Sequence, residues 1–220
     1  MAATPCAEVE APELAWHGEA PRLPCLVWRW TAPRLAISSA PVGGGITAVR
    51  WVINAQVPAD YARCDLNAHL QAIAADCACT GRGLGLLTAA QVRRWQRVEE
   101  AGVYADATVG ISRPTYAADA EDAISAYQPQ TINLVVQLPV RLTAAALVNA
   151  VITATEAKTQ ALFEAGVPGT GTASDAVCIL CPAQGQQASF AGPRSTWGAR
   201  LARAVHATIH AGLKTAWPLH

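Results

Sequence analysis

Polar side chains crowd into one short segment, ITATEAKTQAL (residues 152–162), of a stretch that is otherwise rich in alanine and valine. The surrounding sequence predicts a helix here. At about 100° per residue, one narrow arc of that helix holds Asn149, Thr153, Glu156 and Gln160. The opposite half gathers Leu147, Val148, Val151, Ile152 and Leu162, with Lys158 emerging among them. The two charges, Glu156 and Lys158, therefore do not face each other.

This polar stripe has two interpretations. It can be the solvated face of the helix, with Lys158 extending past the edge of the core. Alternatively, it can face a pocket, because its groups are short amides, hydroxyls and a carboxylate rather than the long charged residues that usually cover an exposed helix. Small flanking alanines would let a ligand or another backbone approach closely.

A second carboxylate, Asp175, follows the glycine-rich segment GVPGTGTAS (166–174). The candidate nucleophilic or binding hydroxyls of the chain are Thr170, Thr172 and Ser174 in this segment, and Ser38 and Ser39 further upstream. A hydroxyl nucleophile needs an activating base within hydrogen-bond reach. No GxSxG elbow surrounds any of these hydroxyls, so the spacing alone selects none of them.

A second glycine-rich segment, Gly43, Gly44 and Gly45, follows the two serines. Glycine adopts positive φ and has no side chain, so backbone N–H groups can approach a ligand here and form a cradle for an oxyanion, a phosphate or a propionamide group. The other interpretation is a tight turn between two strands.

Metal and redox patterns are weak. His206 and His210 are one helical turn apart, but no glutamate lies between them and no third ligand is identifiable, so we predict no metal site. Cys178 and Cys181 have CxxC spacing, yet DAVCIL (175–180) predicts a buried strand that would send the two thiols to opposite faces. The seven cysteines are expected to be reduced.

The pattern of elements predicts an α+β fold with one mixed, largely antiparallel sheet and about three main helices. The expected strands are 26–30 and 34–38, separated by a turn at TAP, then 46–57, a hairpin over 93–112, 131–140 and 175–180. The expected helices are 65–77, one capped by Thr143 and stopped by Gly166, and 196–215. GRGLGLL (81–87) predicts a glycine-rich turn, and 113–130 a long irregular loop.

Length and composition predict a single domain over residues 21–220, preceded by a flexible or extended arm over residues 1–20, with regular structure beginning near Leu23. The formal net charge is zero, so nucleic acid is not an expected partner. No apolar run is long enough to span a membrane, and the N-terminus lacks the pattern of a signal peptide. We expect a soluble, cytoplasmic protein. The sequence does not predict its oligomeric state and is compatible with a homo-oligomer.

An ordered set of sequence blocks resembles the adenosylcobinamide amidohydrolase family over roughly residues 35–215. The blocks are SSAPVGGG (38–45), NAQVPADY (54–61), GLLTAA (85–90), ATVGISRP (107–114), TINLVV (131–136), LVNAVITATEAKTQAL (147–162), GTGTASDA (169–176) and FAGPRSTWG (190–198). Family members usually have GTATDA where this chain has GTGTASDA, so Ser174 stands beside the expected acid, Asp175. A substitution there implies a possible difference in substrate choice.

The resemblance implies hydrolysis of the amide bond that joins a propionate side chain of the corrin ring to aminopropanol, giving adenosylcobyric acid for corrinoid salvage. Cobalt arrives with the substrate, and no cofactor of the protein's own is expected. The competing hypothesis is a corrinoid-binding or trafficking module without hydrolysis.

Under this resemblance, Glu156 is the expected general base, buried in a cleft, with Lys158 orienting a loop or a substrate carboxamide and Asp175 as the second carboxylate. Glu156→Gln should then abolish turnover. The residues expected to position the substrate are Ser38, Ser39, Gly43, Gly44, Gly45, Asn54, Gln56, Thr153, Gln160, Thr170, Thr172 and Ser174. Trp51 and Trp197 adjoin family-like blocks and are expected near the pocket, where flat side chains suit a broad, apolar ring.

Overall fold

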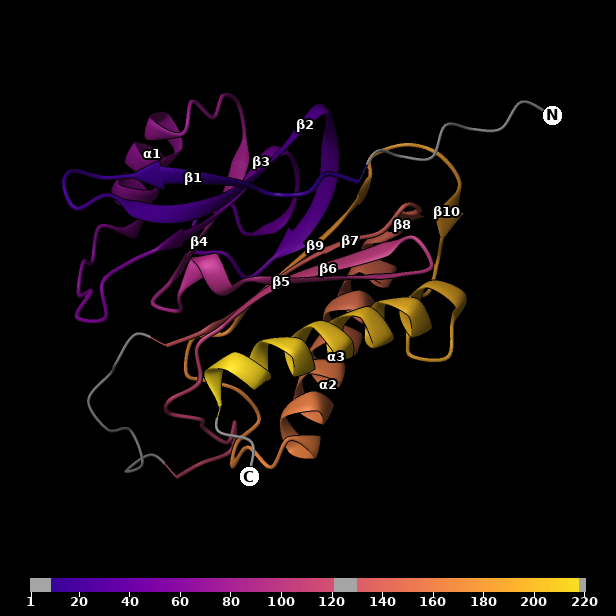
Figure 1. Ribbon diagram of the computed structural model, residues 1–220. Coiled ribbons are helices and arrows are strands. Elements are labelled where there is room, and N and C mark those ends of the chain that lie inside the picture. The colour runs from indigo at the N-terminus through magenta and orange to yellow at the C-terminus, as the bar shows by residue number, and fades with distance from the viewer. Residues whose placement is uncertain (1–8, 121–129, 218–220) are drawn as a thin grey trace.

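The computed structural model of the chain describes residues 9–120 and 130–217 (Figure 1). Its strands are β1 (Glu13–His17), β2 (Leu23–Ser38), β3 (Gly45–Gln56), β4 (Gly83–Thr88), β5 (Gln96–Glu100), β6 (Val103–Val109), β7 (Ile132–Gln137), β8 (Arg141–Leu142), β9 (Ala176–Pro182) and β10 (Gln187–Ala188). Its helices are α1 (Leu66–Asp76), α2 (Ala144–Glu164) and α3 (Thr196–Ala216), with a short 3₁₀ turn, η1 (Val92–Arg94). The predicted α+β class and its three main helices are confirmed.

One sheet has the order β4-β3-β2-β9-β7-β6-β5, and β1 pairs with β2 beside this path. The β3–β4 and β7–β9 pairs are parallel and the other pairs of this sheet are antiparallel, which confirms the predicted mixed, largely antiparallel sheet. The hairpin is also confirmed, since β5 and β6 pair from Gln96↔Ala107 to Glu100↔Val103.

Strand β2 is long and belongs to two parts of the sheet. Its first part pairs with β1 and β3, and its last part, Arg34–Ser38, pairs with β3 and β9. The prediction of two strands separated by a turn at TAP is wrong, because the chain continues as one strand with a shift of register between Arg29 and Arg34. Proline cannot donate to a ladder and is tolerated at such an irregularity, where Pro33 lies.

The sheet folds over itself along β2, so that two half-sheets face each other. Between them, Leu26 and Trp28 of β2 and Leu86 of β4 share a core with Val135 of β7 and Leu180 of β9. Helices α2 and α3 lie together against the outer face of the β9–β7–β6–β5 half, and α1 lies on the far side of the molecule (Figure 1). Helix α1 covers the outer face of the β2–β3–β4 half through a third cluster.

Because both faces of the central strands are covered, their residues are apolar on both sides. Cys178 belongs to the core between the half-sheets, whereas Cys181 belongs to the core beneath the helices. The prediction that this CxxC pair points to opposite faces is confirmed. Cys178 and Cys181 are free thiols.

Helix α2 begins and ends as its local sequence predicts. The Thr143 side chain accepts a hydrogen bond from the backbone N–H of Ala146 at 3.1 Å, and Gly166 follows the helix with a φ of 68°. Its buried face consists mainly of alanines, namely Ala146, Ala150, Ala154, Ala157 and Ala161. Val148 and Ile152, expected on the apolar half, are instead 48% and 50% exposed. The helix packs on the sheet through its alanine face, because small side chains let the helix lie closer to the sheet.

Two expectations about local structure are wrong. GRGLGLL does not form a turn, since residues 83–88 form strand β4, where Gly83 lies against the indole of Trp51 and Gly85 against Leu70. Any side chain at Gly83 would overlap that indole, so glycine here serves packing rather than a turn. Regular structure also begins before Leu23, because Glu13–His17 adds β1 to the edge of β2.

A buried carboxylate lies between the half-sheets. Asp106 of β6 is 1% exposed, and it accepts hydrogen bonds from the indole Nε1 of Trp28 at 3.2 Å and from Arg97 at 3.3 Å. Burial raises the pKa of Asp106 to about 7, although Arg97 and Trp28 act in the opposite direction. The carboxyl group thus links β2, β5 and β6.

The raised pKa of Asp106 predicts a pH-dependent contribution to stability. Between its ordinary pKa of 3.8 and about 7, the folded protein retains a proton that the unfolded chain has released, so the contribution falls as the pH rises through this window. A shift of this size corresponds to a free energy on the order of 4 kcal/mol. Asp106→Asn should remove this dependence, as measured by urea unfolding at pH 5 and pH 8. Asp60→Asn, at an exposed position, is the control. If the free energy of unfolding changed equally with pH in the wild type and in Asp106→Asn, the raised pKa of Asp106 would be contradicted.

Candidate active site

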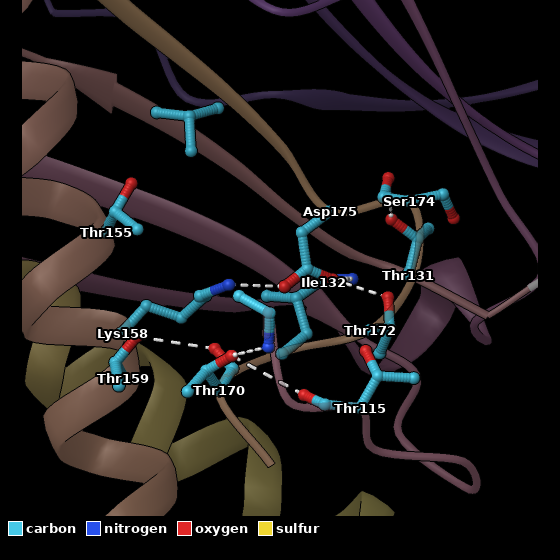
Figure 2. Close-up of polar contacts among 12 residues, drawn as sticks. Thr115, Thr131, Ile132, Thr155, Lys158, Thr159, Thr170, Thr172, Ser174 and Asp175 are labelled. Carbon is cyan, nitrogen blue, oxygen red and sulfur yellow. Dashed lines mark hydrogen bonds and ion pairs between the residues drawn. The ribbon is translucent and has the colours of Figure 1, made fainter. Parts of the chain in front are cut away.

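A buried ion pair joins helix α2 to the start of strand β9. The Nζ of Lys158 donates a hydrogen bond to Oδ2 of Asp175, and the two side chains are only 8% and 12% exposed (Figure 2). Lys158 leaves the inner face of α2, and Asp175 immediately precedes β9. Hydrogen bonds between ionised groups are stronger than neutral ones, so this contact fixes the loop that carries Asp175.

The other oxygen of Asp175 is also held. Its Oδ1 accepts a hydrogen bond from the hydroxyl of Thr172 at 2.5 Å and from the backbone N–H of Ile132 at 2.9 Å. Three donors from α2, the glycine-rich segment and β7 therefore converge on one carboxylate, as Figure 2 shows. This convergence sets the orientation of the carboxylate with little freedom.

Gly171 makes room for the ion pair. A Cβ at this position would overlap Oδ2 of Asp175 and would lie 2.6 Å from Nζ of Lys158. The segment is anchored from its other side, since the N–H of Thr115 donates to the carbonyl of Gly171 at 2.9 Å and the N–H of Thr170 donates to the carbonyl of Thr115 at 2.8 Å. Sequence reasoning did not single out Gly171, although its place between two candidate threonines was a signal.

A cavity of about 360 Å³ lies beside Asp175. Its polar wall comes from β7 and from the residues that precede β7 and β9, together with Ser39. Its apolar wall comes from β4, α1, the segment after β3 and the connection between β2 and β3. The polar wall contains Ser39, Gln130, Thr131, Asn133, Ser174 and Asp175, and the apolar wall contains Pro41, Val57, Tyr61, Leu66, Leu86 and Leu87. A mostly apolar pocket with a few convergent polar groups is the usual form of a small-molecule site.

Buried amides support the polar wall from behind. Nδ2 of Asn133 donates to Oδ1 of Asn54 and to the carbonyl of Leu87, both at 2.9 Å, and Nδ2 of Asn54 donates to the hydroxyl of Thr108 at 2.9 Å. The hydroxyl of Thr131 lies 3.0 Å from Oδ1 of Asn133. This amide network crosses from one half-sheet to the other. It includes the predicted Asn54, but Thr108, Thr131 and Asn133 were missed, because they lie inside runs that sequence analysis treated as buried strand.

Ser39 is the predicted hydroxyl that remains able to donate into the cavity. Its Oγ accepts a hydrogen bond from the N–H of Val177 at 3.1 Å, and among the described residues no acceptor for its own hydroxyl hydrogen lies within hydrogen-bond distance. In contrast, the Ser174 hydroxyl donates to the carbonyl of Gln130 at 3.0 Å. Ser39, Ser174 and Asp175 are therefore the predicted site residues that line the cavity directly, while Lys158, Thr172 and Asn54 contact its walls from outside.

The polar stripe of α2 does not face this cavity, so the prediction that it does is wrong. Glu156 is exposed and is not part of the cavity wall, which contradicts its expected burial in a cleft. Gln160 is also exposed and donates to Glu164 at 2.7 Å, and Thr153 is buried but donates to the carbonyl of Ala191 at 2.9 Å. The arc that packs on the sheet is the one that contains the alanines and Lys158.

Ser38 is the last residue of β2, Gly45 is the first of β3, and Gly43 and Gly44 lie in the connection between the two strands. Gly43 and Gly45 have positive φ values of 73° and 86°, and a side chain at Gly44 would overlap the carbonyl of Ala40. Ser38 is buried, and its Oγ accepts a hydrogen bond from the N–H of Ala40 at 3.0 Å. None of these four residues lines the cavity, and their geometry is that of the tight turn.

Four other predicted binding residues have contacts away from the cavity. Trp51 packs in the core beneath α1, and its indole N–H donates to the carbonyl of Gly81 at 3.1 Å. The Cζ of Arg200 lies over the ring of Trp197, 4.7 Å from the ring centroid. Oε1 of Gln56 accepts a hydrogen bond from the N–H of Val92 at 3.0 Å, and the Thr170 hydroxyl accepts one from the N–H of Ala117 at 3.0 Å. The expectation that the two tryptophans lie at the pocket is wrong.

His206 and His210 lie on α3 with their rings stacked, and Nε2 of His206 lies 2.7 Å from Oε2 of Glu164. In the described part of the chain, no three or more His, Cys, Asp or Glu residues are grouped so that they could hold a metal ion. Within the same residues, none of the helices combines the length and the apolar character that crossing a membrane would need.

Comparison with known proteins identifies the family. The family model described as adenosylcobinamide amidohydrolase matches residues 11–219. The adenosylcobinamide amidohydrolase of Methanosarcina mazei is 32% identical over 187 residues, which cover 80% of this chain and 88% of that protein. The adenosylcobinamide amidohydrolase of Halobacterium salinarum is 40% identical over 86 residues, which cover 39% and 36% of the two chains. The chain therefore belongs to the adenosylcobinamide amidohydrolase family.

Proposed function

We propose that this protein hydrolyses the amide bond between a corrin-ring propionate and aminopropanol in adenosylcobinamide, giving adenosylcobyric acid and the amino alcohol. Membership of the family supports the reaction class. The single observation that carries the proposal is the carboxylate of Asp175 on the wall of the cavity, held from behind by Lys158. Both residues lie in sequence blocks that carried the family resemblance.

Amide hydrolysis needs a base for the attacking water, donors for the developing oxyanion, and a proton for the leaving amine. Asp175 takes a proton from water as the water oxygen bonds to the amide carbon. The same proton then passes to the amine nitrogen as the C–N bond breaks, which leaves a carboxylic acid and an amine. The Ser39 hydroxyl, which can donate into the cavity, hydrogen-bonds the carbonyl oxygen.

Lys158 is a positioning residue in this proposal. It is buried, it contacts Asp175, and it is not part of the cavity wall. Its ammonium group holds Oδ2 of Asp175 and offsets the carboxylate charge in a partly desolvated site. The corrinoid brings its own cobalt, and the proposed steps use no cofactor of the protein.

A covalent route through Ser39 is the alternative within the same cavity. Its Oγ would attack the amide carbon while Asp175 receives the hydroxyl proton, and that proton would pass to the amine nitrogen as the C–N bond breaks. Water would later cleave the ester, which returns the hydrogen to Oγ and releases the acid. Intact-protein mass spectrometry during turnover distinguishes the two routes, because only the covalent one adds the mass of the corrinoid acid less one water to the chain.

The first prediction is hydrolysis itself. The purified protein, incubated with adenosylcobinamide, should release free aminopropanol, which mass spectrometry detects directly. The buffer without protein is the control. Tight binding with intact substrate after long incubation would instead favour the corrinoid-binding module.

The second prediction separates the ion pair from the exposed stripe. Asp175→Asn should lower kcat by about 10²–10⁴-fold, the usual worth of general acid–base catalysis. Lys158→Met should also lower kcat, because it removes the group that holds Oδ2. Glu156→Gln, on the exposed side of the same helix, should stay within about threefold of wild type, which reverses the expectation from sequence. Equal losses in Glu156→Gln and Asp175→Asn would contradict this assignment.

The third prediction concerns the space that Gly171 leaves open. Gly171→Ala should displace the ion pair and lower kcat at least tenfold, with a loss of stability of about 1–3 kcal/mol from overpacking. Gly192→Ala is the matched control, because the atoms nearest to its Cβ would be those of the ring of Phe190, which is 56% exposed and can move. Unchanged kcat in a folded Gly171→Ala protein, as judged by thermal unfolding, would show that the pair tolerates displacement.

A further inference from the structure

The cavity beside Asp175 is small for a corrinoid. Its volume, about 360 Å³, lies near the lower end of the range of roughly 300–1,000 Å³ that pockets for drug-sized ligands span. A corrin ring with its peripheral amides and an adenosyl group is much larger than such a ligand. The amide arm alone, a propionamide with a three-carbon amino alcohol, is smaller and fits.

Two open depressions adjoin the cavity and extend it. One runs along the N-terminus of α1 and shares Pro41 and Leu66 with the cavity. The other lies beside the C-terminal part of α3 and shares Ala89 and Gln130. The cavity is therefore the most enclosed of three adjoining hollows, and a ligand larger than the cavity has two directions in which it can extend.

The depression at α1 is the better seat for a flat, apolar ring. Pro41 and Leu66 line both this depression and the cavity and add apolar surface. Tyr61, on the apolar wall of the cavity, stacks on His69 with ring centroids 5.4 Å apart and an interplanar angle of 24°. The Tyr61 hydroxyl and Nδ1 of His69 lie 2.7 Å apart, which fixes the orientation of the tyrosine ring. Asn67 and Gln71 line the same depression and offer amides to the amide-bearing edge of a corrin.

The depression at α3 is less suitable. Its lining includes many small residues, the apolar side chains of Val109 and Ile111, and one charged residue, Arg94, whose guanidinium donates to the carbonyl of Thr215 at 3.5 Å. Adenosylcobinamide is a cation, because three charges on cobalt exceed the one negative charge of the corrin and the one of the adenosyl carbanion. Arg94 would repel it.

We propose that only the amide arm of the corrinoid enters the cavity, and that the macrocycle stays outside on the surface formed by Pro41, Tyr61 and Leu66. This inference rests on the proposed function. In this arrangement the rim binds the ring, and the cavity with Asp175 acts on the arm. Tyr61 and Leu66 therefore determine affinity for the corrinoid without contacting the bond that breaks.

Equilibrium dialysis, with the corrin absorbance as readout, tests this arrangement without depending on turnover when adenosylcobyric acid is the ligand. Adenosylcobinamide is dialysed against chains that also carry Asp175→Asn, so that it is not hydrolysed during the measurement. Tyr61→Ala and Leu66→Ser should each raise the dissociation constants of adenosylcobinamide and of adenosylcobyric acid, which lacks the aminopropanol, by about tenfold. Kinetics should show the same rise in KM, with kcat changed far less. Two control variants are Val148→Ser, at an exposed apolar position on α2, and Arg94→Ala. Each should leave the dissociation constants of both corrinoids within about twofold of the wild-type values.

The outcomes separate the two proposals. Unchanged binding in both rim variants, with thermal unfolding showing that they are folded, would overturn the placement of the ring while leaving hydrolysis intact. Altered binding in Arg94→Ala alone, in either direction, would overturn it in favour of the other depression. If the wild type binds adenosylcobinamide without cleaving it, the proposed function fails, and the rim variants still decide where the ring lies. Failure of the wild type to bind either corrinoid overturns both.

Discussion

The site depends on one ammonium group and one carboxylate that are almost fully removed from water. Transfer of two charges from water is costly, and their attraction offsets that cost only when the geometry is good and the remaining hydrogen-bonding positions are filled. Asp175 nearly meets this condition, since its two oxygens accept from Lys158, Thr172 and the backbone of Ile132. Of the roughly four acceptor positions of a carboxylate, one is then left for a water molecule in the cavity. The pair therefore ties α2, the glycine-rich segment and the sheet into one rigid unit at the cavity.

The requirements of this pair explain the small residues around it. Lys158 can reach Asp175 because α2 packs on the sheet through alanines, which bring its axis close to β9. Gly171 has no side chain because the two charged groups occupy that space. Larger residues at these positions would add apolar contact but would separate the charges, and each buried charge would then lack its partner, at a typical cost of about 3–5 kcal/mol. Local packing is thus subordinate to the electrostatics of the site.

Local signals predicted what local interactions decide. The Thr143 cap, the stop at Gly166 and the β5–β6 hairpin follow from neighbouring residues alone, and so does the opposite orientation of Cys178 and Cys181. A helical wheel separated Glu156 from Lys158 but could not show which side of the helix meets the sheet. That choice depends on how closely the helix can approach the sheet. The alanines of α2 are buried against it, whereas Val148 and Ile152 are exposed. Strand β4 and the continuous β2 were missed because partners distant in sequence impose them.

The amide network shows why the cavity could not be located from spacing. Asn54, Thr108 and Asn133 come from β3, β6 and β7, and they meet only because the sheet folds over itself along β2. A buried amide without partners is destabilising, so each of these residues is tolerable only while the others are present. The hydrogen bonds that join the half-sheets also hold Asn133 at the cavity wall, and the fold and the site therefore share the same polar residues.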